Sequence, residues 1–493
     1  MIAAHLAVLQ VVLPLVAAPL CLLLRREVLA WWMALTAAWI SLVNAALLLD
    51  RVLLLGPISY DLGGWAAPLG IVYRIDALNG MMLLLISATA AIVLPYARLS
   101  VQREIGSERA ASFYAALLLC MTGLMGMTAT GDAFNVFVFL EISSLSTYAL
   151  IALGQDRRAL TAAFQYLIMG TLGGTFILIG IGFMYAATGT LNMADLAARL
   201  PLAENQRAVQ TAFAFFIVGI SLKLALFPLH LWLPNAYAYA PSVVTIFLAA
   251  TATKVAVYVM LRFTFDLFGA HHAFADITLA RVFPILAGLG VILASLTALY
   301  QDHVKRRFAY SSVAQIGYIV LGIALLTPAG LTAGLLHLIN HALAKGALFM
   351  ALGCLYYRLG AMSLSALAGA AREMPFSAAA FVIAGLSLIG VPLTAGFISK
   401  WYLLLASLEH GQWLLAVIIV GGSLLALAYV WQVVEQLYFC APPGDRPAIT
   451  EAPWSLLIPT WIMVIANVYL GIDSSLTVNL ADQAMRALLE AQP

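Results

Sequence analysis

The basic side chains of this sequence fall into two environments. All nineteen arginines lie in polar connectors or at the ends of long apolar runs. Of the five lysines, Lys305 lies in a connector, and the other four fall inside the apolar runs: Lys223, Lys254, Lys345 and Lys400. Keeping an unpaired charge in apolar surroundings is costly. Lysine, unlike arginine, readily exchanges its proton when buried. The division favours reversible protonation of these lysines over a static role, which would use both residue types.

One carboxylate lies deep within the apolar runs of the first half of the chain. Glu141 stands in the segment FNVFVFLEIS, residues 134–143. A buried carboxylate needs a cationic partner, and Lys223 is the candidate at a similar depth. Pairing would keep both groups charged, and a proton reaching the pair would release the proton of the lysine. A fixed structural ion pair is the alternative. Glu435, near the end of a later run, fits a structural and a functional role equally well.

Two histidines and a lysine recur at helical spacing. His337, His341 and Lys345 are four residues apart, so they share one stripe of a helix. Histidine titrates near neutrality, and the stripe therefore predicts a proton relay. Hydrogen-bonded packing residues are the alternative. Zinc binding lacks support, because Leu338 replaces the glutamate of HExxH and no third ligand is evident. His230, beside a predicted helix break, carries less weight.

The sequence holds no motif for covalent chemistry. It has no Ser-His-Asp set, and the glycines of residues 170–175 are not followed by Gly-Lys-Ser/Thr, so close helix packing explains them better than a phosphate loop. The four cysteines are scattered, which gives no basis for a disulfide or a metal cluster. We therefore expect no cofactor, no metal and no enzymatic activity in this chain alone.

The elements that carry these residues are long and apolar. Hydrophobic residues make up 64% of the chain and charged residues 9%, against about 25% charged in ordinary soluble domains. Crossing a bilayer takes about 20 apolar residues, and only helices satisfy their own backbone in lipid at that length. The sequence predicts an all-α polytopic membrane protein in a lipid bilayer. A net charge of +2 gives no reason to expect a nucleic-acid partner.

Windows of about 19 residues predict about fourteen transmembrane helices. They cover residues 3–24, 29–49, 77–97, 110–130, 133–153, 161–187, 208–228, 241–263, 279–299, 309–327, 331–357, 376–406, 412–438 and 454–474. Residues 475–493 are expected at the membrane interface. Lysine and arginine number thirteen in the odd-numbered connectors, from Arg25 to Arg446, and seven in the even-numbered connectors and the tail. Basic residues concentrate on the cytoplasmic side, so both termini are predicted on the outer side.

Two of these helices are predicted to be broken. Proline interrupts the seventh at Phe227-Pro228 and the twelfth at Gly390-Val391-Pro392. Lys223 directly precedes the first break and Lys400 follows the second. Broken helices in corresponding positions of two halves are typical of inverted-repeat transporters, where they form the binding sites. Ordinary proline kinking is the alternative.

Together these residues resemble a known family, the antiporter-like membrane subunits. The group comprises the large subunits of Mrp multisubunit cation/proton antiporters, the N, M and L subunits of respiratory complex I, and subunits of membrane-bound hydrogenases. The resemblance rests on Glu141, on SLKLALFPLHLWLP at residues 221–234, on Lys254, on His337 to Lys345, and on Lys400. Residues 60–71, 131–135 and 188–195 look most like the Mrp D subunit. Gln165 and His230 depart from the pattern, since relatives often have a lysine and an aromatic residue there.

The resemblance implies a fold and a set of roles. It implies two inverted five-helix repeats, giving residues 1–109 as N-terminal helices, 110–263 and 264–438 as the repeats, and 439–493 as a last helix and tail. It also implies that Glu141 and Lys223 form a gating pair and that Lys254 is a central relay residue. His337, His341 and Lys345 would link the two halves, and Lys400 would be the terminal proton-loading site.

The function implied is proton translocation within a multisubunit Na+/proton antiporter of a bacterial or archaeal cytoplasmic membrane. Its expected partners are the other subunits of that complex, protons, Na+ and the bilayer. The alternative is a proton-pumping membrane subunit of a redox complex, either complex I or a hydrogenase. A stand-alone solute transporter is weaker, because no polar substrate pocket is visible in the sequence.

Overall fold

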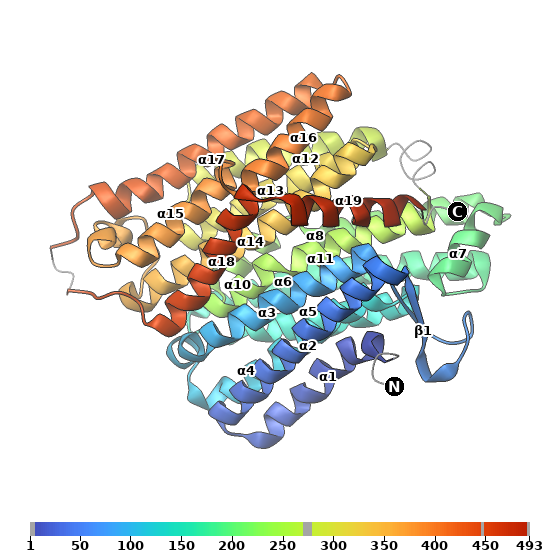
Figure 1. The fold of residues 1–493 in the computed structure, drawn as a ribbon, viewed down its shortest axis with the longest axis horizontal. Coiled ribbons are helices and arrows are strands. Elements are labelled where there is room, and N and C mark those ends of the chain that lie inside the picture. The colour runs from blue at the N-terminus through green and yellow to red at the C-terminus, as the bar shows by residue number, and fades with distance from the viewer. Residues whose placement is uncertain (1–4, 270–278, 445–447, 491–493) are drawn as a thin grey trace.

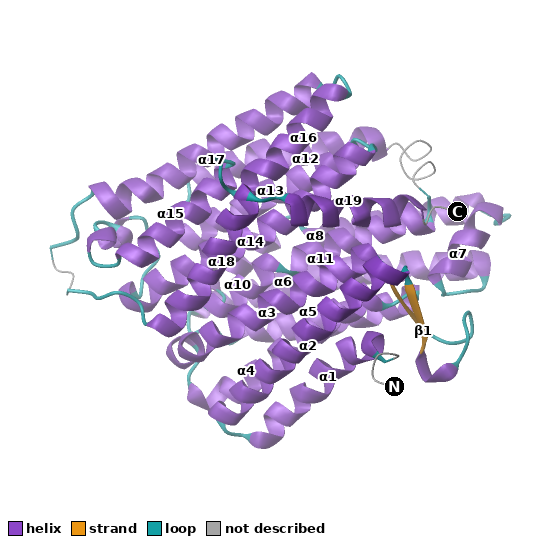
Figure 2. Cartoon of the chain, viewed as in Figure 1, coloured by secondary structure: helices purple, strands orange, loops and turns teal. Residues whose placement is uncertain are grey.

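The protein is almost entirely helical, as Figures 1 and 2 show. A computed structural model describes residues 5–269, 279–444 and 448–490. Residues 270–278 of the predicted second repeat and Arg446 of the connector count therefore lie outside the described residues. Most of the helices run alongside one another, and one small hairpin stands at an edge of the bundle (Figure 2). The all-α, many-helix membrane fold predicted from composition is confirmed.

The elements follow the predicted order closely. The strands are β1 (Ile58–Asp61) and β2 (Val72–Ile75), and a π-helical turn, η5, covers Arg262–Leu267. The helices are α1 (Leu6–Leu24), α2 (Glu27–Leu55), α3 (Ala77–Glu104), α4 (Ala110–Ala129), α5 (Ala133–Ala152), α6 (Arg157–Thr188), α7 (Met193–Arg199), α8 (Gln206–Leu224), α9 (Trp232–Tyr239), α10 (Ser242–Ala250), α11 (Ala252–Leu261), α12 (Leu279–Leu299), α13 (Val304–Ala324), α14 (Pro328–Leu359), α15 (Pro375–Ile389), α16 (Ala395–Glu409), α17 (Trp413–Phe439), α18 (Trp454–Ile472) and α19 (Ser475–Glu490).

Twelve of the fourteen predicted spans coincide with helices that are long and apolar enough to cross a membrane. The described residues hold 12 such helices, or up to 13 if one bent pair counts as a single span. The absence of the other two predicted spans from this set has clear physical reasons. The tenth is α13, whose first turns carry the charges of residues 305–307. The twelfth is divided into α15 and α16, each of 15 residues.

Both proline-marked breaks are present. Helix α8 ends at Leu224, Ala225 takes a left-handed conformation, and the chain resumes as α9. Helix α15 ends at Ile389, Gly390 has φ of 89°, and α16 follows after Pro392. A third break was not predicted, because no glycine or proline marks it. The eighth span is interrupted at Thr251, which separates α10 from α11.

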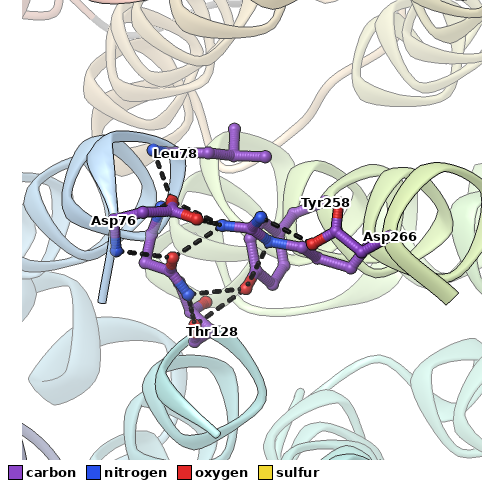
Figure 3. Close-up of polar contacts among 7 residues, drawn as sticks. Asp76, Leu78, Thr128, Tyr258 and Asp266 are labelled. Carbon is purple, nitrogen blue, oxygen red and sulfur yellow. Dashed lines mark hydrogen bonds and ion pairs between the residues drawn. The ribbon is translucent and has the colours of Figure 1, made fainter. Parts of the chain in front are cut away.

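The hairpin leads directly into a buried polar cluster. Strands β1 and β2 pair antiparallel, with Ile58 opposite Ile75. Asp76 then caps α3 and accepts hydrogen bonds from Arg262 at 2.5 and 2.6 Å (Figure 3). Arg262 also donates to Asp266 at 2.8 Å and to the Tyr258 hydroxyl at 3.2 Å. This cluster joins the N-terminal helices to the end of the eighth span.

The C-terminal residues form an amphipathic helix against the bundle. Helix α19 packs on α3 and α14 and crosses the face of the molecule seen in Figure 1. Its buried side is Thr477, Ala481, Ala484, Met485 and Leu488. Its location at the membrane interface stays a prediction, as do the boundaries of the two repeats.

Candidate functional site

The predicted pair of Glu141 and Lys223 lies at the contact of α5 with α8. The Lys223 Nζ is 3.7 Å from Glu141 Oε1 and donates a hydrogen bond of 2.7 Å to Ser144 Oγ. Glu141 Oε1 has no hydrogen-bond partner among the described residues. The lysine is buried, whereas 25% of the glutamate side chain is exposed. The two groups form a loose ion pair in which a neutral hydroxyl makes the closest contact with the ammonium group.

Glycines of α6 allow this pair to form. A Cβ atom at Gly174 would lie 2.3 Å from Glu141 Oε1, and one at Gly173 would lie 3.1 Å from the carbonyl oxygen of Gly219 on α8. Helix α6 therefore approaches both neighbouring helices more closely than any larger residue would permit. The close-packing interpretation of these glycines is confirmed.

Lys254 lies just beyond the unpredicted break of the eighth span. Its side chain is buried, and its ammonium group donates to the backbone carbonyl of Ala249, next to the break at Thr251. A cavity of about 30 Å³, lined by residues that include Lys223 and Ala252, lies between α8 and α11. A cavity needs about 10–15 Å³ to hold one water molecule, so this space suffices for a single water beside Lys223.

The two histidines of α14 have different surroundings. One nitrogen of His337 is 2.9 Å from Ser399 Oγ and the other is 2.9 Å from Gln315 Oε1. The His341 ring is nearly parallel to that of His337, with 6.1 Å between centroids. Neither nitrogen of His341 has a hydrogen-bond partner among the described residues, although the side chain is buried. Buried polar groups are normally satisfied by protein or by ordered water, so His341 marks a place for internal water.

Lys345 and Lys400 bind the same kinds of oxygen atoms. The Lys345 ammonium donates to the Phe308 carbonyl at 2.7 Å and to Ser311 Oγ. The Lys400 ammonium donates to the carbonyls of Leu388 and Ile389 at 2.8 and 3.1 Å and to Ser423 Oγ at 3.0 Å. Leu388 and Ile389 end α15, where carbonyls lack helical partners and the helix dipole is negative. The break of the twelfth span therefore creates the binding site of this ammonium group.

The structure thus joins part of the predicted series directly. Ser399 of α16 contacts His337 of α14, and Lys400 follows Ser399 directly in the sequence. Among the described residues, no carboxylate lies within 4.0 Å of Lys254, Lys345 or Lys400. A series of ammonium groups held by neutral oxygens can release and regain protons without breaking a strong ion pair.

One expectation about basic residues was wrong. Lys305 does not lie in a polar connector but is buried in the first turn of α13, with 4% exposure. Two of the arginines expected in connectors or at span ends, Arg262 and Arg307, are also buried. Arg307 donates to the carbonyls of Gln301 and Tyr429, and Arg262 to two aspartates. Both lie close to helix ends, where carbonyls or carboxylates satisfy a guanidinium group.

Several neighbours of the relay residues were missed in the sequence. Their shared feature is a small polar side chain on an apolar helix, and they are Ser144, Gln315, Ser399 and Ser423. A signal existed for one of them, because Ser311 and Gln315 recur at helical spacing within a span. His230 lies buried in the break after α8, stacked on Phe227, and Glu435 is exposed on α17.

Comparisons with known proteins cover nearly the whole chain. A family model described as NADH:quinone oxidoreductase/Mrp antiporter, TM matches residues 130–426. The N subunit of the NADH-quinone oxidoreductase of Desulforudis audaxviator is 42% identical, with 95% of this chain and 96% of the relative covered. The D subunit of the Na(+)/H(+) antiporter of Bacillus subtilis is 29% identical, with 98% and 97% covered. A chain in the structure of the Mrp complex from a Dietzia species matches with a TM-score of 0.90 and 26% identity, with 99% and 98% covered.

Proposed function

We infer the function from one premise: this chain belongs to the NADH:quinone oxidoreductase/Mrp antiporter transmembrane family. The resemblance noted in its motifs is thereby confirmed. We propose that the chain is the proton-translocating subunit of a multisubunit cation/proton antiporter that exchanges Na+. It moves ions and performs no covalent reaction itself. The similarity to the D subunit of a Na(+)/H(+) antiporter and to a chain of an Mrp complex supports this proposal.

The observation that carries the proposal is the buried series of ionisable groups. Lys254, Lys345 and Lys400 are each held by carbonyl or hydroxyl oxygens. Holding a charge at the bilayer centre costs about 2.5–3.5 kcal/mol on insertion scales, and these neutral acceptors offset part of that cost. Each lysine therefore retains a protonated state that it can also give up.

Each residue has a distinct role in the proposed transfer. Glu141 and Lys223 form the gating pair, since loss of the pairing leaves the lysine without a carboxylate and favours release of its proton. Lys254 receives the proton in the centre. His337, His341 and Lys345 pass it between the two halves, and Lys400 holds it at the far end. The contact from Ser399 to His337 supplies the last connection.

We place the chain in a bacterial or archaeal cytoplasmic membrane, as one of several subunits, with both termini on the outer side. The excess of lysine and arginine in the odd-numbered connectors supports this orientation. The hairpin of β1 and β2 in the second connector, which includes Arg74, then lies on the outer side.

Proton movement in everted vesicles that contain the whole complex tests the proposal. A Na+ pulse should drive proton movement in the wild type, and Glu141→Gln and Lys223→Ala should abolish it. Arg486→Gln is the matched control, because Arg486 is exposed on α19 and lies outside the relay. Wild-type rates in both relay variants would reject the assigned roles.

A second function is favoured by a specific observation. The relative with 42% identity belongs to an NADH-quinone oxidoreductase, whereas the antiporter relative is 29% identical. The same relay would then be driven by electron transfer in partner subunits. Purification of the native complex separates the two functions. Flavin or iron–sulfur subunits in the complex indicate the redox-driven function, and a complex of membrane subunits without them indicates the antiporter.

A further inference from the structure

A large polar cavity of the described structure lies away from the relay residues. It has a volume of about 920 Å³ and lies where α3 ends and α13 begins. Acidic and basic side chains line it together, among them Glu104, Asp156, Arg158 and Lys305. A cavity of this size and polarity accommodates many water molecules. Bulk protons can therefore reach any ionisable group on its wall.

Lys305 is the buried ionisable group of this wall. Its side chain is 4% exposed, and its ammonium group donates to the Ala240 carbonyl at 3.3 Å. The ammonium group also lies 5.2 Å from the centroid of the Tyr356 ring. No carboxylate lies within 4.0 Å of it among the residues described, so its environment repeats that of the relay lysines.

Glu104 brings a carboxylate to the same cavity wall as Lys305. Its two oxygens are fixed by neighbours: Ser100 donates to Oε1 at 2.8 Å, and Ser242 donates to Oε2 through its backbone at 2.8 Å and its hydroxyl at 3.1 Å. A carboxylate held in this way stays in place near the ammonium group without forming a direct ion pair. The carboxylate of Glu104 attracts a proton to Lys305 but makes no direct ion pair with the ammonium group.

Helix α13 connects this wall to the relay. Lys345 donates to the Phe308 carbonyl and to Ser311 Oγ, which follow Lys305 on the same helix. Lys305 and Ser311 are six residues apart, about 9 Å along the helix axis. Two buried rings lie against the Lys345 ammonium, with the centroids of Phe308 and Phe349 each 5.7 Å away. The Lys345 side chain is fully buried, so bulk water does not contact it directly.

We propose that Lys305 is the proton-exchange site of this subunit, which passes protons between the cavity beside Glu104 and Lys345. The inference rests on the proposed proton translocation and adds where protons cross between cavity water and the relay. In one direction of transport the Lys305 amine takes a proton from cavity water, becomes an ammonium group and gives that proton to the neutral Lys345 amine. In the other direction the neutral Lys305 amine takes the proton from the Lys345 ammonium group and returns it to cavity water.

Transport by the whole complex in everted vesicles tests this site. Lys305→Met should lower the rate of proton movement on the order of a hundredfold, the scale of a lost proton-transfer group. Lys305→Arg should lower it as well, because arginine keeps the charge but does not release its proton. Arg103→Gln is the matched control, since it removes an exposed positive charge from the same cavity and should leave the rate unchanged.

A rescue experiment separates proton transfer from a structural role. Lys305→Ala should regain activity when a small primary amine, such as ethylamine, is added on the cavity side, and not when it is added on the opposite side. Wild-type rates in Lys305→Arg and Lys305→Met, together with inactive Glu141→Gln and Lys223→Ala, would overturn the exchange role of Lys305 while the proposed function stands. Normal rates in all four variants would instead reject the proposed function.

Discussion

The chemistry of the buried lysines depends on what binds them. Lys254 and Lys345 contact backbone carbonyls and hydroxyls, and within the described residues Lys223 alone of the span lysines has a carboxylate nearby. A buried carboxylate partner would hold the charged form strongly, since removing one member of such a pair costs about 3–5 kcal/mol. Carbonyl and hydroxyl oxygens satisfy the ammonium group without a countercharge, which suits the proton exchange that we propose.

The close approach of α6 to Glu141 gives a prediction at this scale. Gly174→Ala should place a methyl group 2.3 Å from Glu141 Oε1 and displace the carboxylate from Lys223. Overpacking of this kind costs about 1–3 kcal/mol, and we expect slower proton movement in vesicles as well as a lower melting temperature. Gly182→Ala on the same helix is the control, because nothing lies within 4 Å of the added atom. Equal transport in the two variants would contradict the prediction.

His303 gives a prediction about pH. Burial, followed by the nearby charges of Lys305 and Arg158, lowers the pKa of His303 from 6.5 to about 4. Its Nδ1 accepts a hydrogen bond from the Arg306 backbone at 3.3 Å and caps α13, which requires an unprotonated nitrogen. Above pH 6.5 the protonation of His303 does not affect stability, since the ring is neutral in the folded and the unfolded state. As the pH falls from 6.5 toward 4, the unfolded chain binds a proton that the folded chain does not, and stability decreases.

His303→Asn removes this titration and keeps a side chain that caps helices. Melting temperatures of the purified complex in detergent, measured near neutral and near acidic pH, check the prediction. The wild type should lose more stability on acidification than the variant does. The same loss in both proteins would show that His303 does not contribute.

At the scale of elements, the sequence predicted the helices and the breaks that proline marks. Breaks at Phe227-Pro228 and Gly390-Val391-Pro392 follow from local backbone chemistry, so one sequence suffices to find them. The break at Thr251 does not, because neither glycine nor proline marks it. The burial of Lys305 was missed for a related reason. Its polar neighbours suggest a connector, and only the packing of α13 beside α14 shows that the lysine is covered.

The end of α15 gives a prediction at the same scale. Gly390 has a positive φ of 89°, and a Cβ atom there would lie 2.9 Å from Lys400 Cδ. Gly390→Ala should therefore strain the break and displace the lysine, with slower proton movement as the result. Gly411→Ala is the control, because Gly411 also has a positive φ, 67°, but nothing within 4 Å of the added atom. Both variants should lose about 1–2 kcal/mol of stability from the left-handed backbone, and transport should fall in Gly390→Ala alone.

At the scale of the whole molecule, the cluster of Asp76, Arg262 and Asp266 joins distant parts of the chain (Figure 3). The sequence did not reveal it, since the two residues of its central ion pair are 186 positions apart. Arg262→Gln leaves the buried Asp76 and the partly buried Asp266 without their cation and should destabilise the protein by about 3–5 kcal/mol. Arg199→Gln, which removes an exposed ion pair with Asp195, should cost about 0–1 kcal/mol. Thermal unfolding of both variants in detergent checks the difference, and equal melting temperatures would refute it.

That cluster also bears on how the predicted segment 1–109 relates to the rest. Asp76 belongs to this segment, and its partner Arg262 belongs to the next, while α1, α2 and α3 all pack on α4. A chain break in the short connector between α3 and α4, residues 105–109, would leave these contacts in place. Two fragments expressed separately, one ending and the other beginning in this connector, should associate in the membrane and co-purify. In Arg262→Gln the same two fragments should come apart more easily.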